Sequence, residues 1–206
     1  PEGPDGDAPE EHNIEGFLID ISEDMEERQN LLTMAESDPL TGVLNRRAFD
    51  AAAEEIARHA RYTGESVGAI TFDIDEFKAI NDTHGHDVGD MLLRHVVAVA
   101  VNVVRKRDIF ARLGGDEFAV LLPESGEEAA CRLAKRLLQH VDSATMPEGI
   151  PMRPTLSVGA AALIGSNVYV PELMKAADTA MYRAKRAGRN RFACASEESH
   201  SGSDNA

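Results

Sequence analysis

The sequence has 206 residues, which is long enough for one domain with a sizeable core and extra segments at its ends. Hydrophobic residues make up 43% and charged residues 28%, the balance of a globular protein rather than a disordered or fibrous one. The formal net charge is −15, which opposes general binding to nucleic acid or to an anionic membrane. A phosphate-bearing ligand must therefore meet local positive charge or a bound metal.

The sequence shows no sign of a disulfide-rich, zinc-binding or membrane-spanning protein. Cys131 and Cys194 lie in separate segments without a Cys-x-x-Cys or His-rich partner, so we expect neither a disulfide framework nor a zinc site. A reducing cytosol suits this cysteine usage. No apolar run reaches the roughly 20 residues of a membrane helix, and the acidic start resembles no signal peptide. A longer parent protein could still carry a sensor or a membrane anchor upstream of Pro1.

The two ends differ in composition from the rest of the chain. Residues 1–13 and 196–206 are rich in Pro, Gly, Ser, Asp and Glu, so we expect two disordered tails. Residues 14–37 are predicted to form a linker, with a short strand at Gly16–Ser22 and a charged helix at Glu23–Glu36. This helix is either a dimerising stalk or a solvent-exposed connection.

Residues 38–195 alternate between helical and strand patterns, which predicts one globular domain. In chain order we predict a helix at Asn45–Tyr62, a strand at Val67–Ile74, a helix at Val88–Val104, strands at Asp108–Leu113 and Glu117–Pro123, a helix at Glu127–Val141, a strand at Thr155–Ile164, a helix at Pro171–Ala187 and a strand at Arg191–Ala195. Gly114 and Gly115 favour a tight hairpin, because glycine adopts positive φ at little cost. A hairpin between two strand–helix crossovers predicts an α/β (α+β) fold with helices packed over a mixed sheet.

Carboxylates gather where two of these strands end. Asp73 closes a buried strand, and Asp75 shares its side only if the strand continues through both residues. Asp116 and Glu117 lie at the hairpin turn, with adjacent side chains facing apart. If Asp116 points toward Asp73, the two can share Mg²⁺ and support phosphoryl transfer. Taken alone, each pair is more typical of a solvated loop than of a metal site.

Other polar residues near these carboxylates suit a guanine nucleotide. Asn81 and Asp90 can pair with a guanine edge, because a carboxylate accepts from N1–H and from the exocyclic amine. Lys78, Lys185 and Arg189 can neutralise a triphosphate. The alternative for Lys185 and Arg189 is that they complement the end of their own helix.

These blocks together resemble the GGDEF-domain family, over about Asp38 to Ala195 and in the family's order. The matching blocks are Asp38-Pro-Leu-Thr-Gly42, Asn45-Arg46-Arg47, Phe72-Asp-Ile-Asp-Glu-Phe-Lys78 with Asn81-Asp82, Gly85-His86 with Gly89-Asp90, Leu113-Gly-Gly-Asp-Glu-Phe118, and Ala184-Lys185 with Gly188-Arg189-Asn190. The resemblance implies a ferredoxin-like, nucleotidyl-cyclase-type mixed sheet whose hairpin carries the signature loop. It also implies a diguanylate cyclase, in which two chains face each other and join two GTP into cyclic di-GMP.

The resemblance assigns a role to each site residue. It implies side-chain metal ligands at Asp73 and Asp116, a backbone carbonyl ligand at Ile74, and help from Glu117 in deprotonating the attacking 3′-hydroxyl. It implies guanine contacts at Asn81 and Asp90, phosphate contacts at Lys78, Lys185 and Arg189, and close backbone approach to the nucleotide at Gly114 and Gly115. The metal is Mg²⁺ or Mn²⁺.

A second ligand site is implied ahead of the signature loop. Arg105 and Asp108 stand at the family spacing of the inhibitory Arg-x-x-Asp site for cyclic di-GMP, and Arg136 falls where a second arginine could join it. By pattern alone, a short Arg/Asp run is more typical of a solvated basic patch. Within the family match, product inhibition is expected.

Several functional alternatives stay open from the sequence. A domain of this family could bind GTP or cyclic di-GMP without turnover and regulate a partner. It could instead be another nucleotidyl cyclase of related architecture, although Asp90 favours guanine, or an interaction domain that binds no nucleotide. Residues 16–36 also resemble the closing strand and signalling helix of a PAS sensor, which implies an upstream sensor in the full-length protein.

Overall fold

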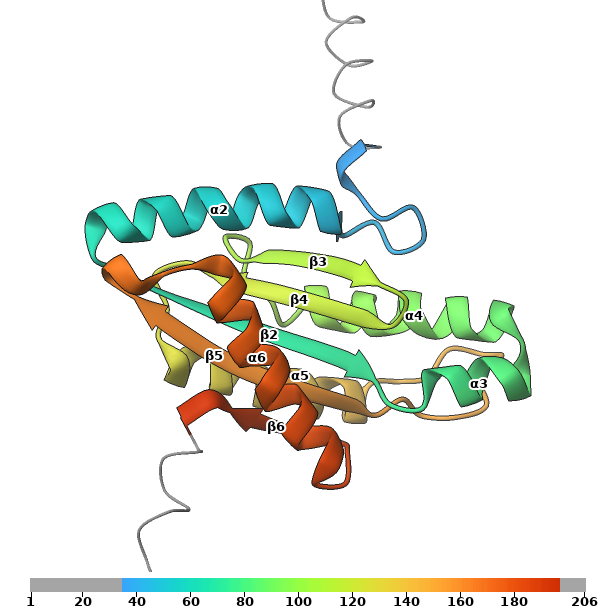
Figure 1. The fold of residues 1–206 in the computed structure, drawn as a ribbon. Helices are drawn as coiled ribbons and strands as arrows, with labels where there is room; N and C mark the ends of the chain where they lie inside the picture. Colours follow the sequence, from blue (N-terminus) through green and yellow to red (C-terminus); the bar gives the residue numbers. More distant parts are fainter. Residues whose placement is uncertain (1–34, 197–206) are drawn as a thin grey trace, which may run out of the picture.

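The structure, a computed structural model, describes residues 35–196 and is built around a six-stranded mixed sheet (Figure 1). The strands, in the sheet order β1-β3-β4-β2-β5-β6, are β1 (Leu44–Asn45), β3 (Ile109–Gly114), β4 (Glu117–Leu122), β2 (Ser66–Ile74), β5 (Leu156–Ile164) and β6 (Arg191–Cys194). The helices are α2 (Arg46–Thr63), α3 (Phe77–His84), α4 (His86–Val101), α5 (Glu127–Ser143) and α6 (Val170–Arg186), with a short 3₁₀ turn η1 at Gly165–Asn167. The predicted α/β fold is confirmed.

Strand β2 holds the middle of the sheet. It pairs antiparallel with β4 on one side and antiparallel with β5 on the other. The two outer strands are parallel to their neighbours, β1 to β3 and β6 to β5. Because β2 is flanked on both edges and covered on both faces, all of its residues after Ser66 are buried.

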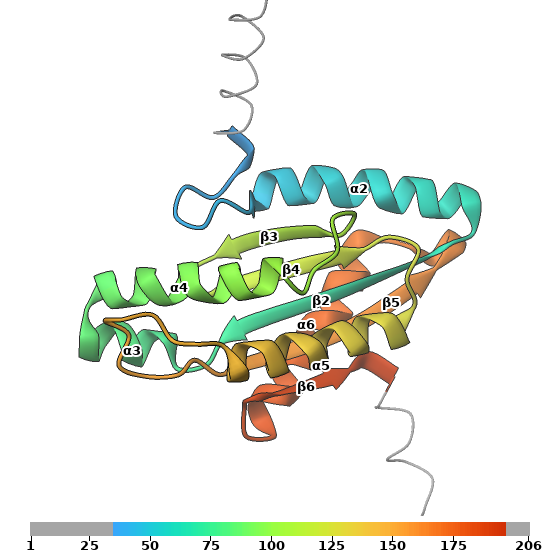
Figure 2. The same cartoon turned by 180° about the vertical axis from the view of Figure 1, so that it is seen from behind.

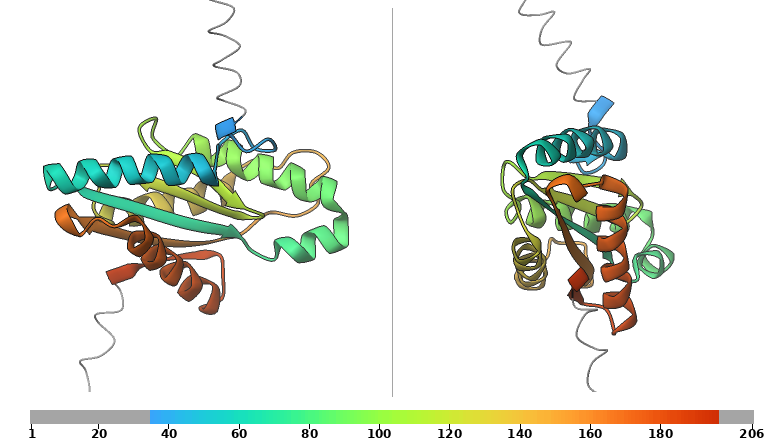
Figure 3. Two further views of the ribbon diagram at one scale, coloured as in Figure 1. Left: turned by 45° about the horizontal axis from the view of Figure 1, so that its top comes forward. Right: turned by 60° about the vertical axis from the view of Figure 1, so that its left-hand side comes forward.

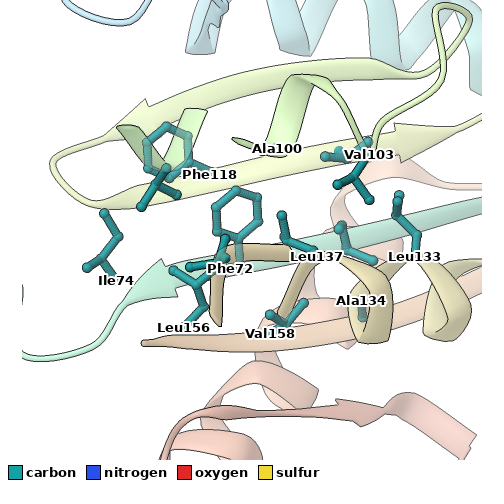
Figure 4. Packing of buried hydrophobic residues seen from close by; sticks show 14 of the residues in the cluster. Phe72, Ile74, Ala100, Val103, Phe118, Leu133, Ala134, Leu137, Leu156 and Val158 are labelled. Atoms are coloured by element: carbon teal, nitrogen blue, oxygen red, sulfur yellow. The ribbon is translucent and has the colours of Figure 1, made fainter. Parts of the chain in front are cut away.

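Alternation along β2 divides the core between the two faces of the sheet. Ile70, Phe72 and Ile74 face α4 and α5, whereas Val67 and Ala69 face α2 and α6. The views from behind and from the side show these helices on opposite sides of the sheet (Figures 2 and 3). On the α4/α5 face, Phe72 stacks on Phe118 with ring centroids 5.1 Å apart (Figure 4).

The predicted helices and strands of residues 38–195 are confirmed, with small shifts at their ends, but the sequence patterns missed helix α3. Its eight residues, Phe77–His84, bury only Phe77, so they carry almost no periodic apolar signal. Helix α4 also ends at Val101, three residues before the predicted end. The missed helix matters because it carries Lys78 and Asn81.

The predictions for the upstream segment fall almost wholly outside the described residues. The strand at Gly16–Ser22 lies outside them, and so does the helix at Glu23–Glu36 except for Ala35 and Glu36, which are helical. Among residues 35–196, no helix is both long enough and apolar enough to cross a bilayer.

The expectation that the two cysteines stay apart was wrong. Cys131 on α5 and Cys194 on β6 form a disulfide, across 63 positions of sequence. The sequence did not indicate this pairing, because the two cysteines meet only when β6 returns to the edge of the sheet beside β5 and packs against α5. The cysteine argument for a reducing compartment is therefore lost.

Helix α6 packs tightly on the sheet at Gly159 of β5. A Cβ atom there would overlap the backbone of α6 at Ala177 and Met181. We predict that Gly159→Ala lowers the free energy of unfolding by about 2 kcal/mol or more, because backbone cannot move aside as a flexible side chain can.

Chemical denaturation of both variants would measure this effect. Gly126→Ala is the matched control, because Gly126 has φ of −82° and nothing within 4 Å of its Cβ position. Equal stability of the two variants would contradict the prediction.

Candidate active site

The carboxylates of the site meet at one end of the sheet, where β2 ends and the β3–β4 hairpin turns (Figure 1). Asp73 lies directly opposite Glu117 in the β2–β4 register. Gly114 and Gly115 form the turn with φ of 151° and 52°, values that favour glycine, and so they place Asp116 beside the end of β2.

A pocket of about 220 Å³ opens at this end of the sheet. It is lined by Asp73, Ile74, Asp75, Glu76, Phe77, Lys78, Asp116, Lys185 and Arg189. The structure therefore brings both predicted side-chain metal ligands, the predicted carbonyl ligand and all three predicted phosphate contacts into one pocket, from three separate stretches of the chain.

Asp73 is the most strongly perturbed group of the pocket. Its side chain is almost wholly buried, and burial raises the pKa of its carboxyl, with the nearby charges of Asp116 and Asp75 acting in the same direction. The ammonium of Lys185, with Nζ 2.9 Å from Asp73 Oδ2, opposes this increase in pKa without cancelling it. The site is therefore short of positive charge.

A hard divalent cation fits this donor set. The carboxylates of Asp73 and Asp116 and the backbone carbonyl of Ile74 are oxygen ligands of the kind that Mg²⁺ and Mn²⁺ prefer. A cation would also relieve the repulsion that raises the pKa of Asp73. The residues do not distinguish the two metals.

Glu117 does not line this pocket. It is exposed on β4 and lines a neighbouring groove of about 470 Å³ that runs between α2 and α6. Asp116 and Glu117 thus open onto different hollows, as expected for adjacent residues at a turn.

The predicted guanine contacts lie at the corner between α3 and α4, and neither Asn81 nor Asp90 lines the metal pocket. The side-chain oxygen of Asn81 is buried and has no hydrogen-bond partner among the described residues. Gly89 on α4 makes room for it, since a Cβ atom there would overlap the Asn81 oxygen. A buried acceptor without a donor is uncommon in proteins, so this oxygen stands out among the polar atoms of the corner.

The predicted inhibitory site is only partly assembled. Arg105 and Asp108 line a hollow of about 530 Å³, and the Arg105 backbone N–H donates to Asp108 Oδ2 at 3.0 Å. The other oxygen of Asp108 is buried without a partner among the described residues. Arg136 is exposed on α5 and does not line this hollow, so its role stays a prediction.

Three residues that support the site were missed by the sequence patterns. Arg112 Nε donates to the Gly115 carbonyl at 2.8 Å, and Arg46 Nε donates to the Leu113 carbonyl at 2.9 Å, so both brace the hairpin turn. Asp75 is buried, and its carboxylate accepts hydrogen bonds from Thr155 just before β5 and from Ser157 in β5. Asp75 gave a sequence signal through its two-residue spacing from Asp73, and Arg46 gave one as part of the Asn45-Arg46-Arg47 block, whereas Arg112 gave none.

The raised pKa of Asp73 leads to a prediction about stability and pH. A carboxyl with a raised folded-state pKa holds its proton more tightly in the native state, so stability is lost as pH rises from about 3.8 through the folded value. Without metal at pH 7, we expect Asp73→Asn to raise the thermal midpoint by about 2–4 °C, corresponding to roughly 1 kcal/mol.

Thermal melts across a pH series in a chelating buffer would measure this difference. The gain should shrink as pH falls toward 4, where Asp73 becomes protonated in the wild-type protein. Asp178→Asn, at an exposed position of α6, is the control. A gain that persists unchanged at pH 4 would contradict the electrostatic explanation.

Comparison with known proteins identifies relatives over most of the chain. The family model "Diguanylate cyclase, GGDEF domain" matches residues 35–191. The response regulator PleD of Caulobacter vibrioides is 39% identical over 169 residues, which are 79% of this chain and 37% of PleD. The diguanylate cyclase DosC of Escherichia coli is 40% identical over 156 residues, 75% of this chain and 34% of DosC. The chain thus spans about a third of the length of these curated relatives.

Solved structures of related domains share the fold. The coiled coil and GGDEF domain of DgcB from Caulobacter crescentus, in complex with c-di-GMP, matches with a TM-score of 0.78 at 29% identity and covers 84% of this chain and 93% of that one. The active GGEEF domain of a diguanylate cyclase from Vibrio cholerae matches with a TM-score of 0.68 at 31% identity, covering 73% and 96%. By its sequence and its fold, the chain belongs to the diguanylate cyclase GGDEF-domain family.

Proposed function

We propose that this domain is an active diguanylate cyclase, which condenses two GTP into cyclic di-GMP and two pyrophosphates. The observation that carries the proposal is the meeting of Asp73 and Asp116 with Lys78, Lys185 and Arg189 in one pocket. The two carboxylates suit a metal ion, and the three basic side chains suit the phosphates of a metal-bound nucleotide. A turn with only a structural role would need neither the carboxylates nor the basic side chains.

The chain's own residues divide the binding of GTP between two regions. Lys78, Lys185 and Arg189 hold the phosphates at the end of β2. Asn81 and Asp90, at the α3–α4 corner, hold the guanine, and the unpartnered oxygen of Asn81 accepts from one of its donors. Because α3 begins three residues after β2 ends, one short helix links the two regions.

The implied metal would be held by Asp73, Asp116 and the carbonyl of Ile74. Mg²⁺ or Mn²⁺ bound there supplies Lewis-acid polarisation of the phosphates. Glu117 lies outside that pocket and assists in removing the proton of the attacking 3′-hydroxyl. That hydroxyl attacks the α-phosphorus of a second GTP, and pyrophosphate leaves.

Each chain holds one GTP, so the reaction requires a homodimer in which two pockets face each other. A monomer is inactive on this proposal. The chain spans 37% of PleD, which is named a response regulator. By analogy, a sensor domain upstream of this chain would control the cyclase in the full-length protein. GTP as the substrate places the domain in the bacterial cytoplasm, whether or not the full-length protein is anchored to a membrane.

The hollow beside Arg105 and Asp108 is proposed as a product-inhibition site for cyclic di-GMP. The buried, unpartnered oxygen of Asp108 can accept a hydrogen bond from guanine, and the exposed guanidinium of Arg105 suits its phosphates. Arg136 would join from α5. In support, a relative with the same fold was solved in complex with c-di-GMP.

We predict that the purified chain with GTP and Mg²⁺ forms cyclic di-GMP, at a rate that rises more steeply than linearly with protein concentration. Asp116→Ala should lower this rate about 100-fold or more, because it removes a metal ligand. Chromatography of the products and melting curves of both proteins would check rate and folding. GTP binding without product, after removal of bound cyclic di-GMP, would favour a catalytically silent regulator instead.

We also predict that Arg105→Ala raises the cyclic di-GMP concentration for half-inhibition by about tenfold or more, since it removes a charged contact to phosphate. The initial rate should stay within about twofold, because Arg105 lies outside the pocket that holds Asp73. Arg132→Ala, at an exposed arginine of α5, is the matched control. An unchanged inhibition curve would remove Arg105 from the site.

A further inference from the structure

Asp75 is a buried carboxylate that the proposed reaction does not use. Its side chain is 5% exposed, yet no basic side chain contacts it among the described hydrogen bonds and ion pairs. Instead it accepts from Ser157 Oγ at 2.6 Å, from Thr155 Oγ1 at 2.8 Å and from the Asn190 N–H at 3.0 Å. Three neutral donors therefore satisfy one buried charge.

These hydrogen bonds join three segments that are distant in sequence. Asp75 follows the last residue of β2, Thr155 and Ser157 lie at the start of β5, and Asn190 lies in the turn between α6 and β6. The Asp75 backbone N–H also donates to the Thr155 carbonyl at 2.9 Å. The carboxylate thus fixes the α6–β6 turn against the end of the sheet.

The turn it fixes has an unusual backbone. Gly188, Arg189 and Asn190 have φ of 113°, 58° and 46°, so two non-glycine residues adopt the left-handed region in succession. Such residues are strained and persist only where surrounding contacts hold them. The hydrogen bond from the Asn190 N–H to Asp75 is one such contact, and it lies one residue from Arg189.

We infer that Asp75 is a positioning residue that holds Arg189 at the phosphate pocket. The inference rests on the proposed function, because it takes Arg189 to bind the phosphates of GTP. The guanidinium already lies over the pocket rim, where its Nε is 3.1 Å from Glu76 Oε1, and Glu76 is itself attached to Asp75 in the chain. That contact therefore joins the residue after Asp75 to the residue before Asn190, which donates to the Asp75 carboxylate.

The test is the affinity for a non-hydrolysable GTP analogue with Mg²⁺, measured by calorimetry on the whole chain. We expect Asp75→Asn to raise the Kd about tenfold, because the neutral amide is a weaker acceptor and turns a donor toward one of the three partners. Asp142→Asn makes the same chemical change at an exposed position of α5 and should leave the Kd unchanged.

A double-mutant cycle separates positioning from general stability. If Asp75 acts through Arg189, the variant with both Asp75→Asn and Arg189→Ala binds the analogue no more weakly than Arg189→Ala alone. Additive losses would overturn the inference, as would an unchanged Kd in folded Asp75→Asn. If Arg189→Ala binds as tightly as wild type, the phosphate role of Arg189 in the proposed function fails instead.

A milder variant keeps the test decisive if Asp75→Asn does not fold. Ser157→Ala removes the shortest of the three hydrogen bonds but retains the carboxylate and its contact with Asn190. We expect a Kd increase of about threefold. A melting curve and a Kd both equal to those of wild type would overturn the inference.

Discussion

The buried charge of Asp73 is the constraint on which the arrangement of the site depends. Strands β4 and β5 pair with β2 on both sides of Asp73, and the residue is only 8% exposed, although it lines the pocket at the end of the sheet. A second carboxylate, Asp116, faces the same space and disfavours ionisation further. The elements that arrive at that end bring cations, Lys78 on α3 and Lys185 on α6. The pocket therefore concentrates the negative charges of Asp73 and Asp116, and cations from neighbouring elements of the chain compensate them.

The sheet makes this concentration possible because β2 is its central strand. A strand that is covered on both faces can end in a buried residue, whereas an edge strand would leave Asp73 in water. The close packing of α6 on β5 at Gly159 also helps to build the site. It allows the last turn of α6 to bring Lys185 within 2.9 Å of Asp73, and a bulkier residue at that position would push the helix away.

Most of the sheet and the long helices could be predicted from the sequence, because their apolar residues recur with the period of a strand or a helix. Apolar alternation in β2 and apolar stripes in the long helices reflect burial on one or two faces, and burial is what the sheet provides. Helix α3 left no such stripe because it buries only Phe77. Asp75 and Asp73 have the same chemistry and similar surroundings in the chain, and only tertiary partners distinguish a metal ligand from a clamp. The contact between Cys131 and Cys194 likewise depends on which helix covers the edge strand, a choice that local patterns do not encode.

Backbone strain is gathered around the same pocket. Of the four non-glycine residues with positive φ among residues 35–196, Glu76, Arg189 and Asn190 flank it and only Glu124 lies elsewhere. Each costs roughly 1–3 kcal/mol, so the turns that carry them are less stable than relaxed turns would be. The hydrogen bonds to buried Asp75 offset part of this cost, since bonds to a charged acceptor contribute more than neutral ones. On the inference that Asp75 positions Arg189, a buried carboxylate outside the proposed chemistry stabilises a backbone conformation that would otherwise be unfavourable.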